Sequence, residues 1–302
     1  MNKYLLVFGF LALLLLVFIW QIDASDLQNW AIDTYNLDET QTQKLQTSLL
    51  NSRNWLWIKI FISFFSLITL TLFFYFQKQC KNLIKDLLKD FQTLLKSCLK
   101  PFQTLSKTQK ITSIFIFCLL NGYVLYHLHH KIPHIDEAFG YVHFIAKGVF
   151  VSALYYPNPN NHIFFNLIST FFDVFVPNKI WVMRLPSFLS FLFLEILLFR
   201  FFLVKYSFSV ALWATLFFAL LSPVQAYAIM GRGYLLQMLF LWLSVHFLVK
   251  ILQNNSQKID KILFVFFSWA AFYTIPTFLY YFLALAMASL VLILPNFVKM
   301  YA

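Results

Sequence analysis

The feature that most constrains this 302-residue sequence is a series of apolar stretches, each about as long as a bilayer is thick. A membrane-spanning helix needs about 20 mostly apolar residues, because lipid offers no partner to an unpaired backbone amide. Eight stretches meet this requirement: about 4–20, 55–76, 111–128, 180–204, 208–230, 234–252, 261–277 and 279–298. The sequence therefore predicts an all-α, polytopic membrane protein with about eight transmembrane helices.

Composition agrees with this prediction and excludes one class of partner. Hydrophobic residues make up 61% of the chain and charged residues 12%, against about 25% charged residues in a soluble domain. The formal net charge of +11 comes largely from lysines beside predicted spans, where anionic lipid and topology account for them. We therefore expect no nucleic-acid partner. The three cysteines lie in the basic segment or inside a span, so no disulfide is expected.

Two span boundaries need separate arguments. The first stretch has no small-residue cleavage pattern at residues 21–25, so we expect a retained signal anchor. The apolar tract 261–298 is too long for one crossing, and the sequence Tyr273-Thr274-Ile275-Pro276 predicts a turn within it.

The distribution of charges predicts the orientation. Segment 77–110 carries eight lysines against Asp86 and Asp90, whereas segment 21–54 carries five acidic residues against Lys44 and Arg53. By the positive-inside rule the first segment is cytoplasmic and the second external. Counting crossings from there places the N-terminus in the cytoplasm and loop 129–179 outside. We expect a multi-pass protein of the inner (plasma) membrane.

The basic cytoplasmic segment has its own pattern. Its apolar residues recur at helical spacing with lysines on the other side, which predicts an amphipathic helix on the inner leaflet. These apolar residues are Leu83, Leu87, Leu88, Phe91, Leu94 and Leu95. Residues 1–110 thus form a two-span appendage, and residues 111–302 a second membrane domain.

Most of the external loop 129–179 is expected to form two interfacial helices too short to span. The first, about 137–150, is amphipathic, and the second, about 161–176, carries one polar stripe that should face water or a cavity. The stripe consists of His162, Asn166, Ser169, Thr170 and Asp173. Proline and asparagine residues at 155–161 predict a turn between the helices.

Asp136 and Glu137 open the first of these helices and allow two interpretations. Asp136 can be an N-cap, with Glu137 in the positive field of the helix N-terminus, together worth about 1 kcal/mol. Alternatively, a carboxylate held at the membrane surface acts as a general base.

Two arginines, Arg184 and Arg232, stand at the predicted external ends of spans. They can snorkel to the interface, but arginine is disfavoured on that side, and a bound phosphate would explain both. Glu195, within a span, is expected to pair with Arg200 or to snorkel.

Histidines also gather near the external loop, at His127, His129, His130, His134, His143 and His162. A zinc or manganese site could be built from such residues, but their spacing matches no standard ligand pattern. The need for a divalent metal or other cofactor therefore stays open.

Several short motifs occur in a fixed order: Asp136-Glu137, the Pro-Asn-Asn-His turn at 159–162, the Arg-Leu-Pro-Ser at 184–187, the Arg-Gly-Tyr at 232–234 and the Tyr-Thr-Ile-Pro at 273–276. This ordered set over residues 111–298 resembles the polyprenyl-phosphate-sugar-dependent glycosyltransferases of GT-C fold, in the branch of protein O-mannosyltransferases and aminoarabinose transferases. Members of that family usually lack the first 110 residues and continue through further spans, so the resemblance predicts a short or truncated form.

The resemblance implies an inverting transfer of sugar from a polyprenyl-phosphate donor to an unknown acceptor glycan, lipid or protein. It implies that Asp136, with Glu137, binds or deprotonates the acceptor hydroxyl. It also implies that His162, Arg184, Arg232 and Tyr234 bind donor or lipid phosphate. Two other interpretations are weighed: a partner subunit that binds lipid phosphate without chemistry, and, less favoured, a small-solute transporter, which would carry its polar groups at the bilayer midplane.

Overall fold

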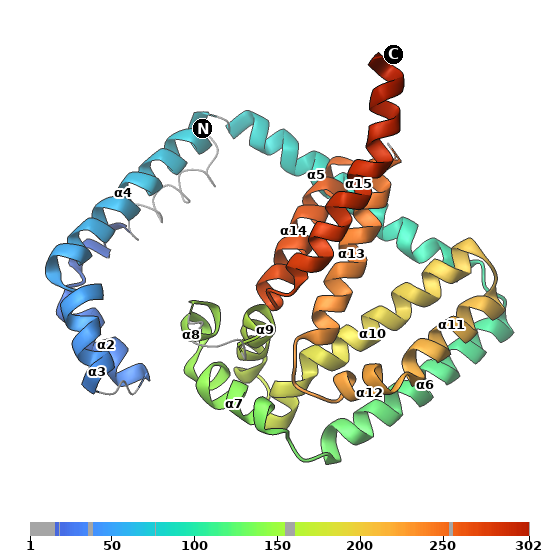
Figure 1. The fold of residues 1–302 in the computed structure, drawn as a ribbon, viewed down its shortest axis with the longest axis horizontal. Helices are drawn as coiled ribbons and strands as arrows, with labels where there is room; N and C mark the ends of the chain where they lie inside the picture. Colours follow the sequence, from blue (N-terminus) through green and yellow to red (C-terminus); the bar gives the residue numbers. More distant parts are fainter. Residues whose placement is uncertain are drawn as a thin grey trace. The chain divides into compact units, whose positions relative to one another are not determined.

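The computed structural model is all-α and confirms the predicted class (Figure 1). It describes residues 16–17, 19–35, 39–75, 77–154, 161–253 and 256–301. Most of the predicted signal anchor at 4–20 lies outside these residues. The chain forms two compact units, Met1–Asp86 and Leu87–Ala302. The predicted domain boundary after residue 110 stays a prediction.

The first unit contains α2 (Ala24–Tyr35), α3 (Glu39–Lys44), a short π-helix (Leu45–Leu49) and α4 (Ser52–Tyr75). A buried lysine, Lys59, ties α4 to the preceding segment. Its Nζ donates to the Trp20 carbonyl at 3.1 Å and lies 5.8 and 5.5 Å from the ring centroids of Trp20 and Trp55. Aromatic faces and a carbonyl thus compensate a cation removed from water.

The second unit begins within α5 (Gln77–Gln103) and contains all the later helices. These are α6 (Lys107–His130), α7 (Ile135–His143), a 3-10 turn (Ile145–Lys147), α8 (Val149–Leu154), α9 (Ile163–Asp173), α10 (Lys179–Lys205), α11 (Phe208–Leu220), α12 (Ser222–Ala228), α13 (Tyr234–Leu252), α14 (Lys258–Thr274) and α15 (Phe278–Tyr301). In Figure 1, α13, α14 and α15 lie together, α6 and α11 lie beside α10, and α7 to α9 gather at one end.

Among the described residues, three helices are long and apolar enough to cross a membrane: α6, α10 and α13. The bent pair α11–α12 makes a fourth if it is counted as one span. These candidates indicate a multi-pass membrane protein. The other predicted spans that fall on described residues form α4, α14 and α15. The predicted break at 273–276 is confirmed, because α14 ends at Thr274 and α15 begins at Phe278.

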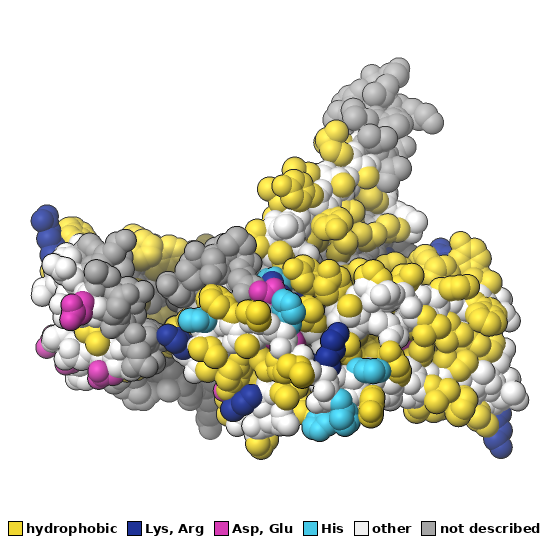
Figure 2. Space-filling view, turned by 60° about the horizontal axis from the view of Figure 1, so that its bottom comes forward, with side chains coloured by type: hydrophobic (Ala, Val, Ile, Leu, Met, Phe, Trp, Pro, Cys, Tyr) yellow, Lys and Arg dark blue, Asp and Glu magenta, His cyan; other side chains and the backbone are white. Residues whose placement is uncertain are grey.

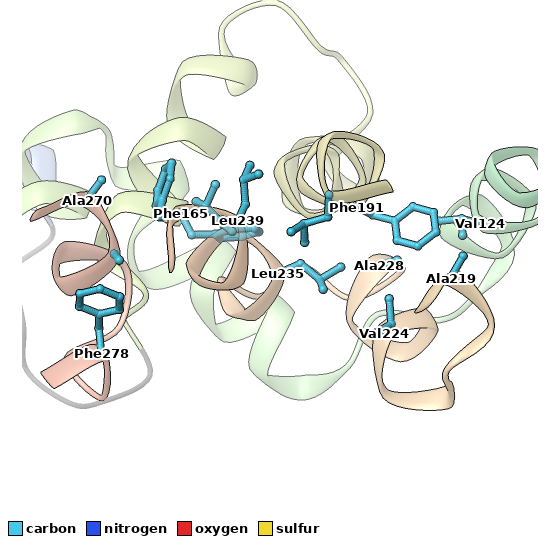
Figure 3. Close-up of a cluster of buried hydrophobic side chains, with 14 of the residues drawn as sticks. Val124, Phe165, Phe191, Ala219, Val224, Ala228, Leu235, Leu239, Ala270 and Phe278 are labelled. Atoms are coloured by element: carbon cyan, nitrogen blue, oxygen red, sulfur yellow. The ribbon is translucent and has the colours of Figure 1, made fainter. Parts of the chain in front are cut away.

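One apolar core joins the helices of the second unit (Figure 3). Phe191 of α10 lies at its centre with no exposed surface, and Phe165 of α9 is 1% exposed. Small residues let neighbouring helices approach closely: Ala219, Ala228, Ala270 and Ala271 are all fully buried. Much of the outer surface is also apolar, as contact with lipid requires.

A polar pair lies within this core and corrects one expectation. Glu195 of α10 is fully buried and does not pair with Arg200; its Oε2 accepts from Asn121 of α6 at 2.8 Å. Arg200 instead donates to the carbonyls of Ser97 and Cys98 on α5. The partner of Glu195 therefore comes from a neighbouring helix, which sequence spacing alone does not reveal.

The predicted span at 208–230 forms two helices, α11 and α12, which are bent by 69° at Leu221. Pro223 causes the break, because it has no N–H to donate to the carbonyl four residues earlier, Ala219, and its ring collides with that turn. The side chain of Gln225 replaces the missing donor, with Nε2 2.8 Å from the Ala219 oxygen. The carbonyl freed by the proline is therefore hydrogen-bonded, and the bend is an ordered feature and not a frayed helix end.

We predict that Gln225→Met lowers the thermal unfolding midpoint of the protein in detergent. The variant keeps the side-chain length but removes the donor to Ala219, which costs about 1–3 kcal/mol for a buried unpaired carbonyl. Ser222→Ala, a change at an exposed residue of the same bend, is the control. Equal midpoints for both variants would contradict this role of Gln225.

Candidate functional site

The predicted site residues meet at the end of the second unit where α6 ends and α10 begins. Histidine and basic side chains gather on this end among hydrophobic ones (Figure 2). Four segments that are distant in the sequence converge there: the start of α7, the start of α9, the start of α10 and the loop 229–233 between α12 and α13.

Glu137 and Arg184 form a buried ion pair. The Arg184 Nε donates to Glu137 Oε1 at 2.8 Å and its Nη2 donates to Oε2 at 2.9 Å, while the two side chains are 2% and 1% exposed. Arg184 Nη1 donates to the carbonyls of Leu128 and Lys131, at 2.7 and 2.8 Å. Four of the five guanidinium N–H groups are thus committed to protein acceptors.

Glu137 is equally committed. Its Oε2 accepts from the backbone N–H of His134 at 2.7 Å, and its Oε1 accepts from that of Gly231. Burial raises the pKa of this carboxyl, but the hydrogen bond from Arg184, the two backbone N–H groups and the arginine charge outweigh burial and lower the pKa overall. The geometry gives Glu137 and Arg184 a positioning role.

The cap of α7 differs from the expectation. His134, not Asp136, is the N-cap, and its Nδ1 accepts from the Asp136 amide at 3.3 Å. Glu137 completes a capping box as the third helical residue. Asp136 keeps a side chain that is 49% exposed, 3.7 Å from the His134 ring nitrogen. Of the two adjacent acids, Glu137 is structural and Asp136 faces solvent.

Two glycines allow the loop before α13 to approach the rest of the site. A Cβ on Gly231 would lie 2.7 Å from the Met183 carbonyl oxygen, and one on Gly233 would lie 2.7 Å from Thr274 Cγ2. The same residues donate backbone N–H groups, Gly231 to Glu137 and Gly233 to His162 Nδ1 at 2.8 Å. The backbone on both sides of Arg232 is thereby held by hydrogen bonds, to Glu137 through Gly231 and to His162 through Gly233.

His162 and Arg232 are both buried, at 4% and 8% exposure, and they face each other. Because the Gly233 N–H can only donate, His162 Nδ1 must be unprotonated, and a neutral ring then carries its proton on Nε2. That Nε2 lies 3.1 Å from Arg232 Nη2, which also carries only protons. Two N–H groups therefore face each other across this distance, and an acceptor placed beside both would relieve the contact.

Burial and the charge of Arg232 lower the pKa of His162 from its ordinary 6.5 to about 3. The ring is therefore neutral at physiological pH. Tyr234, the remaining predicted binding residue, packs edge-on against His162 at 5.1 Å between ring centroids, with the Arg232 guanidinium 5.9 Å from its own ring.

The external-loop helices are shorter than predicted, and the polar stripe of α9 faces the protein interior. The predicted helix at 137–150 is interrupted after His143, and Gly148 adopts φ 90°, a conformation open to glycine, before α8. Ser169 is fully buried, and Thr170 bonds to Ser152 and the Asn166 carbonyl. At the far end of the stripe, Asp173 pairs with Lys179 at 2.9 Å.

Sequence reasoning missed a groove beside this site. It has a volume of about 750 Å³ and lies between the end of α6 and the α11–α12 bend. The last turns of α6 align most of its polar side chains, because residues four apart share a helix face, and α12 contributes the others. From the end of α6 come Tyr123, Tyr126, His127, His130 and Lys131, and from α12 come Ser222 and Gln225. The repeated Tyr–His spacing at 123/127 and 126/130 was the signal available in the sequence.

Metal binding finds no support in the part of the chain that the structure describes, where no three His, Cys, Asp or Glu side chains are placed to hold one ion. Comparison with protein families, with curated proteins and with solved structures gave no match. The site is therefore interpreted from its own geometry.

We predict that Glu137→Gln and Arg184→Met each destabilise the protein by about 3–5 kcal/mol, because each leaves a buried charge unpaired. Lys179→Gln, which breaks the exposed, solvent-screened pair with Asp173, is the matched control and should cost far less stability. Thermal unfolding in detergent measures all three. If the variants at Glu137 and Arg184 lose no more stability than the control, the buried pair does not hold these segments together.

We predict that stability falls as the pH is lowered below 6.5. The folded state keeps His162 neutral down to about pH 3, whereas the unfolded chain takes up a proton near 6.5. Within that window the loss from this group is about 1.4 kcal/mol per pH unit. Glu137, with its lowered pKa, adds acid sensitivity only below its ordinary 4.5. Unfolding midpoints of the natural protein and His162→Gln between pH 7 and pH 5 should therefore diverge in slope; parallel slopes would contradict this assignment.

Proposed function

We propose that this protein transfers a sugar from a polyprenyl-phosphate donor to an acceptor hydroxyl at the extracytoplasmic face of the inner (plasma) membrane. The 3.1 Å proximity of the buried His162 Nε2 and Arg232 Nη2 carries the proposal. A phosphate oxygen accepts from both donors at once, and guanidinium is the side chain best suited to phosphate. The lysine distribution in the sequence supports an external position for this end.

The groove supports an amphiphilic donor. Tyr, His, Lys and Gln side chains on its wall suit a polar headgroup, and Leu220, Ala226 and Ile229 supply apolar surface. Its rim belongs to the same framework, since the Arg184 guanidinium bonds to the carbonyls of Leu128 and Lys131. Ile229 also lies only two residues before Gly231.

Three side chains take part in the proposed reaction. The acceptor oxygen attacks the anomeric carbon of the donor while the bond from that carbon to the phosphate oxygen breaks. Asp136 takes the proton of the acceptor hydroxyl as general base. Arg232, with the His162 N–H, stabilises the charge that the leaving polyprenyl phosphate gains. Attack opposite the leaving group inverts the anomeric centre.

A second function, binding of lipid phosphate without chemistry, is favoured by one observation. Glu137 and Arg184 neutralise each other and lie buried, so Asp136 is the single acid left of the predicted pair. A partner subunit needs the Arg232–His162 site but not Asp136. The two functions therefore differ in whether they require Asp136.

We predict that two variants of the purified protein in lipid lose different properties when they are incubated with a panel of radiolabelled polyprenyl-phosphate sugars. Arg232→Gln should weaken donor binding about 10- to 100-fold, the value of one charged hydrogen bond. Asp136→Asn should leave binding intact and lower transfer about 10²- to 10⁴-fold. Asp173→Asn, an acid at the other end of α9, is the control and should change neither.

The remaining outcomes distinguish the alternatives. Transfer that survives Asp136→Asn removes this residue as the base. Donor binding without transfer by the natural protein favours the binding subunit. The absence of binding to every donor would reject both functions.

A further inference from the structure

The helix α5 sorts its side chains into three separate sectors. At 100° per residue, its exposed apolar residues lie within about 80°, the lysines occupy an adjacent sector, and Asp90 lies opposite. In the part of α5 that belongs to the second unit, the exposed apolar residues are Leu88, Phe91, Leu95 and Leu99, at 59%, 44%, 48% and 59% exposure. The lysines of this stretch are Lys89, Lys96 and Lys100. Apolar surface and positive charge thus share one side of the helix.

The C-terminal part of α5 is fixed to the membrane bundle by one ring stack and two hydrogen bonds. Phe102 stacks on Phe199 of α10 at 6.2 Å between ring centroids, and Leu105 is buried in the same cluster. Arg200 of α10 donates to the carbonyls of Ser97 and Cys98, at 3.3 and 3.2 Å. The protein uses these contacts and leaves the apolar stripe uncovered.

These contacts also set the level of α5 relative to the bilayer. Arg200 lies five residues before the end of the candidate span α10 at Lys205, and the candidate span α6 begins at Lys107, four residues after the end of α5 at Gln103. The helix therefore lies where two spans meet the membrane surface. Its charges exclude it from the hydrocarbon core itself.

We propose that α5 is a binding surface for the anionic headgroups of the bilayer. Leu88, Phe91, Leu95 and Leu99 insert into the lipid, and the adjacent lysines contact lipid phosphates. Charge complementarity selects this occupant: a stripe flanked on one side by lysines matches the boundary between acyl chains and negative headgroups. This inference is independent of the transferase proposal, because its residues lie at the other end of α10 from Arg184.

The first test locates the stripe by fluorescence quenching. The full chain, with its native cysteines changed to serine, is labelled at Phe91→Cys, Leu95→Cys or Thr93→Cys and placed in vesicles of phosphatidylcholine with phosphatidylglycerol. Thr93 is exposed on the opposite side of the same turn and is the matched control. Labels at 91 and 95 should be quenched by spin-labelled acyl chains and protected from aqueous iodide, and the label at 93 should show the reverse.

The second test measures the role of charge. Replacing Lys89, Lys96 and Lys100 with glutamine should reduce acyl-chain quenching at position 95 in mixed vesicles, because each lysine near an anionic surface changes local binding about fivefold. The same changes at Lys131, Lys147 and Lys179 are the control and should have no effect. In phosphatidylcholine alone the lysine variant and the natural residues should behave alike.

Three results would overturn the proposal. Equal iodide quenching at 91, 93 and 95 would show that the stripe faces water. Protection of positions 91 and 95 from both quenchers would show that protein covers it, as in a dimer. Identical quenching with and without phosphatidylglycerol would remove the anionic headgroup as the partner.

Discussion

The buried pair of Glu137 and Arg184 is the interaction on which the rest of this end depends. It joins the start of α7 to the start of α10 and, through backbone groups, includes the end of α6 and the loop before α13. A charge buried without a partner is strongly destabilising, whereas a fully hydrogen-bonded pair is tolerated. Both members of this pair also bond to neighbouring backbone groups, so the pair fixes the arrangement of four segments. Asp136 and Arg232 are each the chain neighbour of a residue that the pair holds.

Around Arg232, the site is built from backbone N–H groups and a neutral imidazole. Gly231 and Gly233 offer their N–H groups to Glu137 and His162, and the imidazole is kept neutral by burial and by Arg232. Among the described residues, Arg232 is the positive side chain that lies against His162, and the hydrogen bonds around it are in place without a ligand. Preorganised donors stabilise developing charge without reorganisation, which is the property that the proposed departure of a lipid phosphate would need.

The all-α class, the positions of most helices and the break before Pro276 could be predicted from the sequence, because each depends on local apolar length and on proline chemistry. The bend at Pro223 was missed although the proline was visible, since whether a proline kinks or ends a span depends on how the freed carbonyl is satisfied. The partners of Glu137, Glu195 and Arg200 were missed for another reason: each comes from a helix distant in sequence. Asp136 and Glu137 look equivalent as neighbours, and only the fold assigns one to the interior and the other to solvent.

The bend between α11 and α12 has a consequence for the bilayer itself. The 13 residues of α11 rise about 20 Å, and α12, turned by 69°, adds only about 4 Å along the same axis. The pair therefore falls short of the about 30 Å of hydrocarbon that a span normally crosses. Hydrophobic mismatch of this size is relieved by local thinning of the membrane. If the bent pair is counted as one span, the bilayer beside α12, where the groove opens, has to be thinner than the bilayer beside a full-length span.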